Sequence, residues 1–121
     1  MKELIYIASP YSHDDPKIVE DNFWRVSNYC AAAVSNGEVV MSPITYGHTL
    51  LEFKDMPSSW EFWTEFCLSI LVKCDKLRVL KMDGWEDSKG VEAEISFAKD
   101  HGIPVEYVEY LDGKFYGTVL Y

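Results

Sequence analysis

The sequence is short of positive charge and lacks long apolar runs. Lys and Arg number 11 against 20 Asp and Glu, so the formal net charge of the 121 residues is −9. Such an acidic surface repels polyphosphate and anionic lipid, which excludes general binding of nucleic acid or of an anionic membrane surface. No apolar run approaches the roughly 18 residues of a membrane helix, and the N-terminus carries no signal-peptide pattern. We therefore expect a cytoplasmic protein that binds neither a nucleic acid polymer nor a membrane.

Motifs that hold cofactors or metals are also missing. The sequence contains neither G-x-x-x-x-G-K-[ST] nor G-x-G-x-x-G, which excludes a P-loop and a dinucleotide-binding loop. Cys30, Cys67 and Cys74 form no C-x-x-C pair and cannot all pair with one another, so buried reduced thiols are expected. The neighbours His13-Asp14-Asp15 are poor metal ligands, because adjacent residues rarely converge on one ion. We expect no cofactor and no metal.

No internal repeat, low-complexity stretch or Pro/Gly-rich linker divides the chain, so we expect one domain over residues 1–121. Short apolar runs alternate with helical periodicities. This order predicts the α/β class, as a three-layer sandwich whose helices cover both faces of a mostly parallel sheet of four to five strands, Rossmann-like or flavodoxin-like. The predicted strands are residues 3–8, 38–44, 77–80 and 103–108; the predicted helices span residues 16–35, 58–73 and 88–101; residues 45–57 are a predicted loop, and residues 115–121 a last extended piece.

Three segments follow the predicted strands and define a candidate site. Ligands of open α/β sheets bind outside the carboxyl ends of the strands. The segments at those ends are Ser9–Asp15, Pro43–His48 and Met82–Gly90. We therefore expect a functional site assembled from these segments.

Two residues near the start of the last predicted helix stand out. Gly90 lies in the first helical turn, where glycine costs roughly 1 kcal/mol against alanine, which indicates a close approach to the backbone. Glu94 falls on the inward stripe between Val91 and Phe97, and burying an unpaired charge is costly. Glu94 is either a helix-border residue whose carboxylate reaches solvent or a catalytic carboxylate at the mouth of the sheet.

The order and spacing of several short motifs resemble nucleoside 2-deoxyribosyltransferase-like proteins, most closely their small, uncharacterised bacterial and phage branch. The resemblance covers nearly the whole chain. It rests on Gly84-Trp85, Ser88, Gly90, Glu94, Ala98, Gly102 and Pro104, on residues 6–11, on residues 38–43 followed by His48, on residues 71–75, and on the aromatic end at residues 115–121.

The resemblance implies cleavage or transfer of the N-glycosidic bond of 2′-deoxynucleosides or their 5′-monophosphates. Glu94 would attack C1′ as in a retaining glycosidase, and the covalent glycosyl-enzyme would pass its sugar to another base or to water. Tyr6 would orient the Glu94 carboxylate. The implied substrate-binding residues are Ser9, Pro10 and Tyr11 on the sugar side, Pro43 and His48 on the base side, Trp85 as a wall, and Ser88 and Gly90, which shape the site.

Two positions depart from the family pattern. The transferases usually carry aspartates where this chain has Ser88 and Cys67, and neither residue replaces a carboxylate well as an acid. Ser88 does match related nucleotide N-glycosidases. The loop carboxylates Asp83, Glu86 and Asp87 are either substitutes for the missing acid or ordinary solvated charges.

These departures keep a second function open, in which the protein binds a nucleoside or nucleotide without turning it over, as a sensor or sequestering protein. A third is an interaction module that retains only the scaffold.

The segment Ser9–Asp15 has no basic residue, which favours an uncharged nucleoside, whereas Lys17, Arg25 and Lys89 keep monophosphates possible. A dense aromatic segment predicts an exposed patch and a homo-oligomer; its residues are Trp60, Phe62, Trp63 and Phe66.

Overall fold

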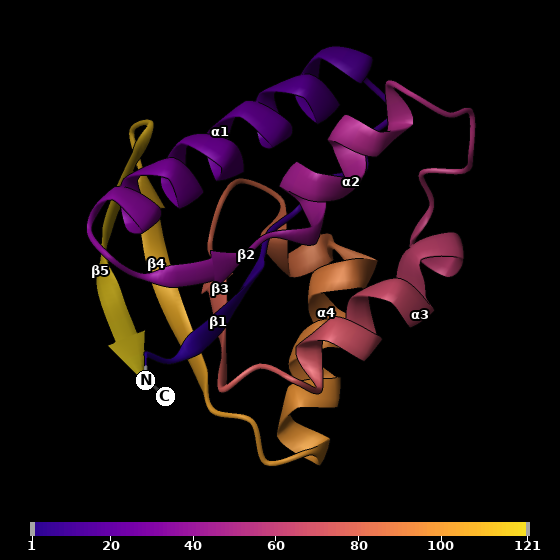
Figure 1. Ribbon diagram of the computed structural model, residues 1–121. Helices are drawn as coiled ribbons and strands as arrows, with labels where there is room; N and C mark the ends of the chain where they lie inside the picture. The colour runs from indigo at the N-terminus through magenta and orange to yellow at the C-terminus, as the bar shows by residue number, and fades with distance from the viewer. Residues whose placement is uncertain (1, 121) are drawn as a thin grey trace.

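The structure is a computed structural model that describes residues 2–120, with side chains through residue 117. Its centre is a five-stranded sheet in the order β2-β1-β3-β4-β5 (Figure 1). Strands β1 to β4 are parallel, and β5 runs antiparallel to β4. Tyr121, the last residue of the predicted extended piece, lies outside the described residues. The strands are β1 (Leu4–Ala8), β2 (Val39–Met41), β3 (Lys76–Leu80), β4 (Val105–Leu111) and β5 (Lys114–Leu120).

Helix starts lie where the sequence offers a capping oxygen. Asp15 caps the first helix and is followed by Pro16, which needs no amide partner at that position. Ser59 and Ser88 cap the helices that lead into and out of β3. These helices begin at residues 16, 60 and 89, at or within two residues of the predicted starts. The helical elements are α1 (Pro16–Ser35), α2 (Pro43–Leu51), α3 (Trp60–Leu71), the 3-10 turn η1 (Trp85–Asp87) and α4 (Lys89–Asp100).

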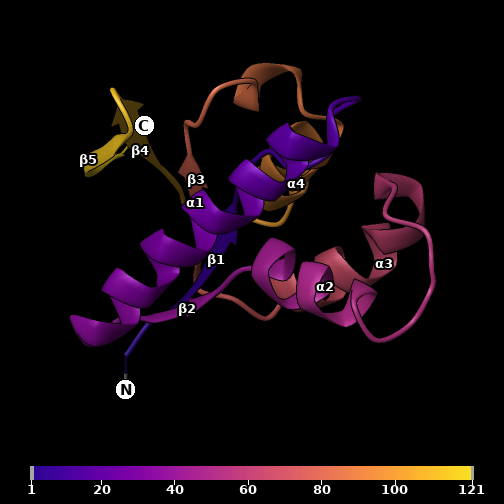
Figure 2. The same ribbon diagram turned by 90° about the horizontal axis from the view of Figure 1, so that it is seen from above.

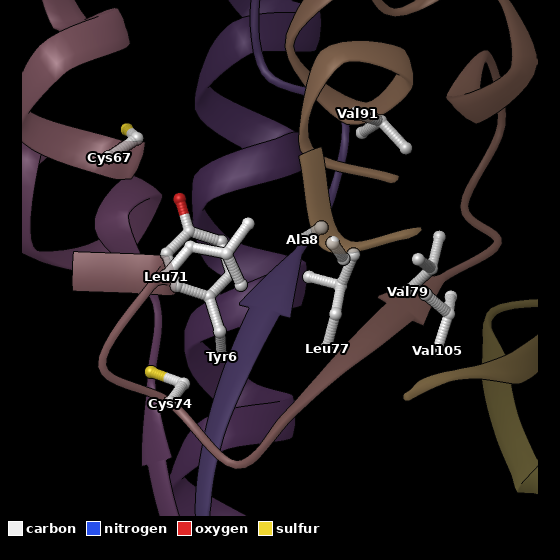
Figure 3. Close-up of a cluster of buried hydrophobic side chains, with 10 residues drawn as sticks. Tyr6, Ala8, Cys67, Leu71, Cys74, Leu77, Val79, Val91 and Val105 are labelled. Atoms are coloured by element: carbon white, nitrogen blue, oxygen red, sulfur yellow. The ribbon is translucent and has the colours of Figure 1, made fainter. Parts of the chain in front are cut away.

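Alternation along the strands divides the core into two layers. Ile5 and Ile7 of β1 pack with Val26 of α1 on one face of the sheet. Tyr6 and Ala8 belong to the cluster on the other face, which α3 and α4 cover (Figure 3). Figure 2 shows α3 and α4 together on one side of the strands. The predicted three-layer sandwich with a mostly parallel sheet is confirmed.

The prediction is wrong between residues 42 and 51. Residues 38–44 were expected to be a strand and residues 45–57 a loop, but β2 ends at Met41 and α2 begins at Pro43. The Ser42 hydroxyl accepts a hydrogen bond from the Thr45 amide at 3.1 Å and so caps α2. Ser42-Pro43 is therefore the same kind of helix start as Asp15-Pro16.

The thiols are free, as expected of reduced cysteines. Cys67 and Cys74 are buried, and Cys30 is half-buried. The two buried thiols do not share one helix, since α3 ends at Leu71. Cys67 and Cys74 nevertheless belong to the same core cluster, whereas Cys30 packs against the cluster on the α1 face of the sheet.

A buried ion pair crosses the α1 face of the sheet. The Arg78 Nε on β3 donates to the Glu106 carboxylate on β4 at 2.6 Å, and both residues are almost fully buried. The same guanidinium binds both carboxylate oxygens of Glu38, at 3.0 and 2.8 Å. Lys76 reaches the second Glu106 oxygen at 2.9 Å. Every charge of the pair thus has a partner, which burial requires.

We predict that Glu106→Ala lowers the free energy of unfolding by about 3–5 kcal/mol, because it leaves the Arg78 charge buried with less compensation. Denaturant titration measures this loss. Glu109→Ala on the same strand is the matched control: its ion pair with Lys81 is partly exposed, so we expect a loss of at most about 1 kcal/mol. Equal losses in the two variants would contradict the assignment of Glu106 as a buried partner.

Candidate active site

A cavity of about 360 Å³ opens at the carboxyl ends of β1 and β3. In the order β2-β1-β3 the chain leaves β1 for one face of the sheet and β3 for the other, and a crevice forms where two such connections diverge. All three segments expected at the site contribute to its lining. A fourth contribution, the start of α3, was not predicted. The expected site residues that line the cavity are Ser9, Tyr11, Pro43, His48, Ser88, Gly90 and Glu94.

Glu94 and Tyr6 form a buried pair beside this cavity. The hydroxyl of Tyr6, in the middle of β1, donates a hydrogen bond to the Glu94 carboxylate on α4. Glu94 is 4% exposed and Tyr6 is fully buried. Because α4 turns Glu94 inward, the carboxylate is not the solvent-reaching group of the first interpretation.

Burial controls the protonation of this pair. Loss of water raises the pKa of Glu94 to about 8, and the hydrogen bond from Tyr6 offsets part of that rise. Burial and the Glu94 charge together hold the pKa of Tyr6 well above its usual value, so the hydroxyl keeps its proton. Glu94 is therefore a carboxyl group that gains and loses its proton near neutral pH, as catalytic carboxyl groups in dry sites do.

Cys67 lies against the same pair, from α3. Its thiol interacts with the Tyr6 hydroxyl, and Figure 3 shows that hydroxyl directed toward the part of α3 that carries Cys67. Burial and the Glu94 charge raise the pKa of Cys67 to about 12. Cys67 is consequently a neutral thiol.

Ser9 supplies a hydroxyl without a partner. Its side-chain oxygen is the one buried side-chain polar atom, among the described residues, that has no hydrogen bond. Ser9 is 4% exposed and lines the cavity. Because an unsatisfied buried hydroxyl is costly, a ligand that reaches it gains a hydrogen bond that the protein alone does not make.

Tyr11 and His48 lie side by side in the lining of the cavity. The Tyr11 hydroxyl lies 2.7 Å from Nδ1 of His48. Nε2 of the same ring lies 3.2 Å from the Glu20 carboxylate, and the Phe23 ring stacks on the imidazole at 3.9 Å between centroids. Both ring nitrogens of His48 are therefore engaged, and the ring has a fixed orientation.

Two tryptophans at the start of α3, Trp60 and Trp63, line the cavity and pack closely against glycines of α4 and α2. A Cβ at Gly90 would lie 3.2 Å from the Trp60 ring, and one at Gly47 would lie 3.4 Å from the Trp63 ring. The close approach expected at Gly90 is thus made by Trp60. The sequence shows the aromatic residues of segment 60–66, but their pattern predicts an exposed patch and does not reveal that they line a cavity. Phe62 is the member of that segment that is mainly exposed.

Several expected site residues lie elsewhere. Pro10 is buried but is not part of the lining, and Trp85 packs edge-on against Tyr107 at 5.8 Å instead of walling the cavity. The η1 turn places Trp85 over the neighbouring strand, which sequence spacing does not reveal. Of the loop carboxylates Asp83, Glu86 and Asp87, only Asp87 lines the cavity, and it is exposed to solvent.

Neither a metal cluster nor a membrane span is found in the described part of the chain. Within residues 2–117, no three His, Cys, Asp or Glu side chains gather in a way that could hold an ion. None of the helices between residues 2 and 120 combines the length and apolar composition needed to cross a membrane.

Comparison with known proteins identifies a family and a relative in fold. A family model described as a domain of unknown function, DUF1937, matches residues 3–110. The sequence matches no curated protein. The solved structure of a 2-deoxyribosyltransferase from the psychrotolerant bacterium Bacillus psychrosaccharolyticus is similar, with a TM-score of 0.62 and 21% sequence identity over 88% of this chain and 72% of that one. At this identity the likeness shows a shared fold, so the expected fold relationship to the transferases is confirmed.

The raised pKa of Glu94 predicts how stability depends on pH. The folded state holds a proton on Glu94 up to about pH 8, whereas the unfolded chain releases it near its ordinary pKa. Between these values the folded state binds more protons, so raising the pH destabilises it by about 1.4 kcal/mol per pH unit. We predict that Glu94→Gln removes this dependence and becomes more stable than the wild type as the pH rises.

Denaturant unfolding at several pH values between about 5 and about 8 measures the effect. Glu92→Gln, an exposed neighbour on α4, serves as the control and should follow the wild type. If the curves of wild type and Glu94→Gln stay parallel over this range, Glu94 does not titrate as described.

Proposed function

The chain belongs to the DUF1937 family of domains of unknown function, and we propose that it cleaves or transfers the N-glycosidic bond of 2′-deoxynucleosides or their 5′-monophosphates. The observation that carries the proposal is the buried Glu94, hydrogen-bonded by Tyr6 at the wall of a cavity. The fold shared with a 2-deoxyribosyltransferase supports it.

In the proposed first step the ionised Glu94 attacks C1′ of the sugar. A bond forms between a carboxylate oxygen and C1′ while the C1′–N bond breaks, and its electron pair leaves with the base, which takes up a proton. A 2-deoxy sugar forms an oxocarbenium-like transition state readily, because no electron-withdrawing 2-hydroxyl opposes it. In the second step an acceptor base or water attacks C1′ and Glu94 departs as a carboxylate.

Tyr6 has a positioning role in this proposal. Its hydroxyl holds one carboxylate oxygen, which leaves the other free to face the sugar. Because the pair lies out of water, the ionised carboxylate carries little hydration to lose before it attacks. The cost is that Glu94 is largely protonated below about pH 8, so turnover should rise with pH as the carboxylate forms.

The substrate side of the proposal rests on the remaining lining. Ser9 offers a hydroxyl for a sugar hydroxyl, and the aromatic rings of Trp60 and Trp63 offer an apolar wall for a base. Lys89 is the basic residue at the rim, but its side chain is largely exposed and lies 4.0 Å from Glu61. This balance favours an uncharged nucleoside over a monophosphate.

We also propose that the chain belongs to the small bacterial and phage branch of the transferase-like proteins and that it forms a homo-oligomer. Phe62 and Tyr46 are exposed beside the start of α3, and Tyr46 stacks on Phe66. Exposed aromatic side chains of this kind favour contact with a second copy of the chain.

A second function is favoured by one specific observation. Cys67 and Ser88 stand where the transferases carry aspartates, and Glu94 is protonated at neutral pH. A site of this composition suits binding of a nucleoside without turnover, as in a sensor or sequestering protein. Stoichiometric binding with no released base would establish it.

We predict that Glu94→Ala abolishes release of the base, because no nucleophile remains. A chromatographic assay with a panel of deoxynucleosides and their monophosphates, each with and without a second free base, measures it. A new nucleoside indicates transfer, and free base with a sugar product indicates hydrolysis. Glu92→Ala on the exposed side of α4 is the control that should keep wild-type activity. Full activity in Glu94→Ala would refute the proposal.

Ser9→Ala should raise KM by several-fold and leave the free energy of unfolding unchanged or slightly higher. The reason is that its hydroxyl has no protein partner to lose. Ser27→Ala is the matched variant: the Ser27 hydroxyl bonds Thr45 at 2.8 Å outside the cavity, so its loss should lower stability without changing KM. The opposite pattern would exclude Ser9 as a ligand contact.

A further inference from the structure

Three residues close together on α1 hold Tyr11 and His48 in place. The Asn22 side chain, itself buried, donates to the Tyr11 carbonyl at 3.2 Å. Glu20 pairs with Nε2 of His48, and Phe23 stacks on its ring. A buried asparagine, an ion-pairing glutamate and an aromatic ring thus converge on one tyrosine–histidine pair. That pair is anchored at backbone and side chain alike, and both of its members line the cavity that contains Glu94.

The hydrogen bonds form a continuous chain from solvent to the cavity. Glu20 is more than half exposed, His48 is mostly covered, and Tyr11 reaches the lining. An imidazole with both nitrogens protonated donates from Nε2 to Glu20 and from Nδ1 to the Tyr11 oxygen. The Tyr11 O–H is then free to donate to a ligand. The protonated imidazole can therefore replace a proton that Tyr11 donates to a ligand.

The proposed reaction needs such a donor, and other groups at the site fit the task poorly. A leaving base takes up a proton as the C1′–N bond breaks, and a positioned acid typically accelerates this by about 10²–10⁴-fold. The Ser88 hydroxyl, which accepts from the Val91 amide at 3.3 Å, belongs to an aliphatic alcohol, and such a group is a much weaker acid than a phenol. Cys67 lies against Tyr6 and Glu94, on the side of the nucleophile. Asp87 is exposed at the rim.

We propose that Tyr11 is the proton donor to the leaving base and that it is reprotonated by His48, which Glu20 holds in place; this inference rests on the function proposed above. As the C1′–N bond breaks, its electron pair takes the Tyr11 proton. The Nδ1 proton of the His48 imidazolium moves to the Tyr11 oxygen, which leaves a neutral His48 whose Nε2–H still faces Glu20. In the second step the acceptor base or water loses a proton as it attacks C1′, and this proton returns through Tyr11 to Nδ1. Tyr11 is the catalytic residue, and His48 and Glu20 are positioning residues that act through it.

Leaving groups of different basicity separate this role from simple support of the cavity wall. Guanine leaves 2′-deoxyguanosine with a proton, whereas the 7-methylated base carries a positive charge and leaves as a neutral molecule without one. If the wild type accepts only pyrimidines, 2′-deoxyuridine and its 5-fluoro derivative, whose base is the weaker proton acceptor, form the corresponding pair.

We predict that Tyr11→Phe lowers kcat for the ordinary substrate by about 10²–10⁴-fold and has a much smaller effect on the activated one. KM should change little for either. His48→Asn should give a smaller loss with the same dependence on the leaving group. Tyr46→Phe removes an exposed hydroxyl from the helix that carries His48, and it should match the wild type with both substrates.

A Tyr11→Phe variant that slows both substrates equally, or neither, would overturn the inference while the proposed function stands. A wild-type chain that releases no base from any of these substrates would overturn both. Glu94→Gln separates the two roles further, since it should lose activity with activated and ordinary substrates alike.

Discussion

The hydrogen bond between Tyr6 and Glu94 is the contact on which the site depends. It joins the first strand of the sheet to the last helix, across 88 positions of the chain. Neither group would be stable alone in that place, because each is almost fully removed from water. Together they create a carboxyl group with a pKa of about 8, held in one orientation at the wall of a cavity. The cost of burying Glu94 is consistent with a site selected for chemistry over stability.

The sheet order explains why the other groups gather around that pair. The order β2-β1-β3 makes a crevice at the carboxyl ends of β1 and β3, and short capped helices bring their first turns to its rim. α4 supplies Glu94 and α2 supplies His48. α1 lies on the other face of the sheet, yet its first turns hold Tyr11 and His48 from outside. A helix on one face of the sheet thus positions two residues of a cavity whose buried Glu94 comes from α4 on the other face.

Much of this arrangement could be predicted from the sequence, and the rest depends on contacts between distant elements. Helical phase correctly turned Glu94 inward, and the caps at Asp15 and Ser88 placed two helices. Ser42-Pro43 carries the same signal but follows an apolar run, so the sequence pattern predicts a strand and a loop where α2 forms. Gly90 indicated a close approach without identifying Trp60 as the group that makes it. The engagement of His48 by Glu20 depends on how α1 crosses α2, which no local pattern encodes.

The proposed covalent bond between Glu94 and the sugar is tested most directly by mass spectrometry of the acid-quenched reaction. The wild-type chain is mixed with the deoxynucleoside that it cleaves fastest, without an acceptor base, quenched during turnover and digested. We predict that the peptide containing Glu94 gains the mass of one deoxyribosyl group, and that fragmentation places the group on Glu94. Release of base with the sugar attached to another residue, or with no adduct at any quench time, would contradict this account.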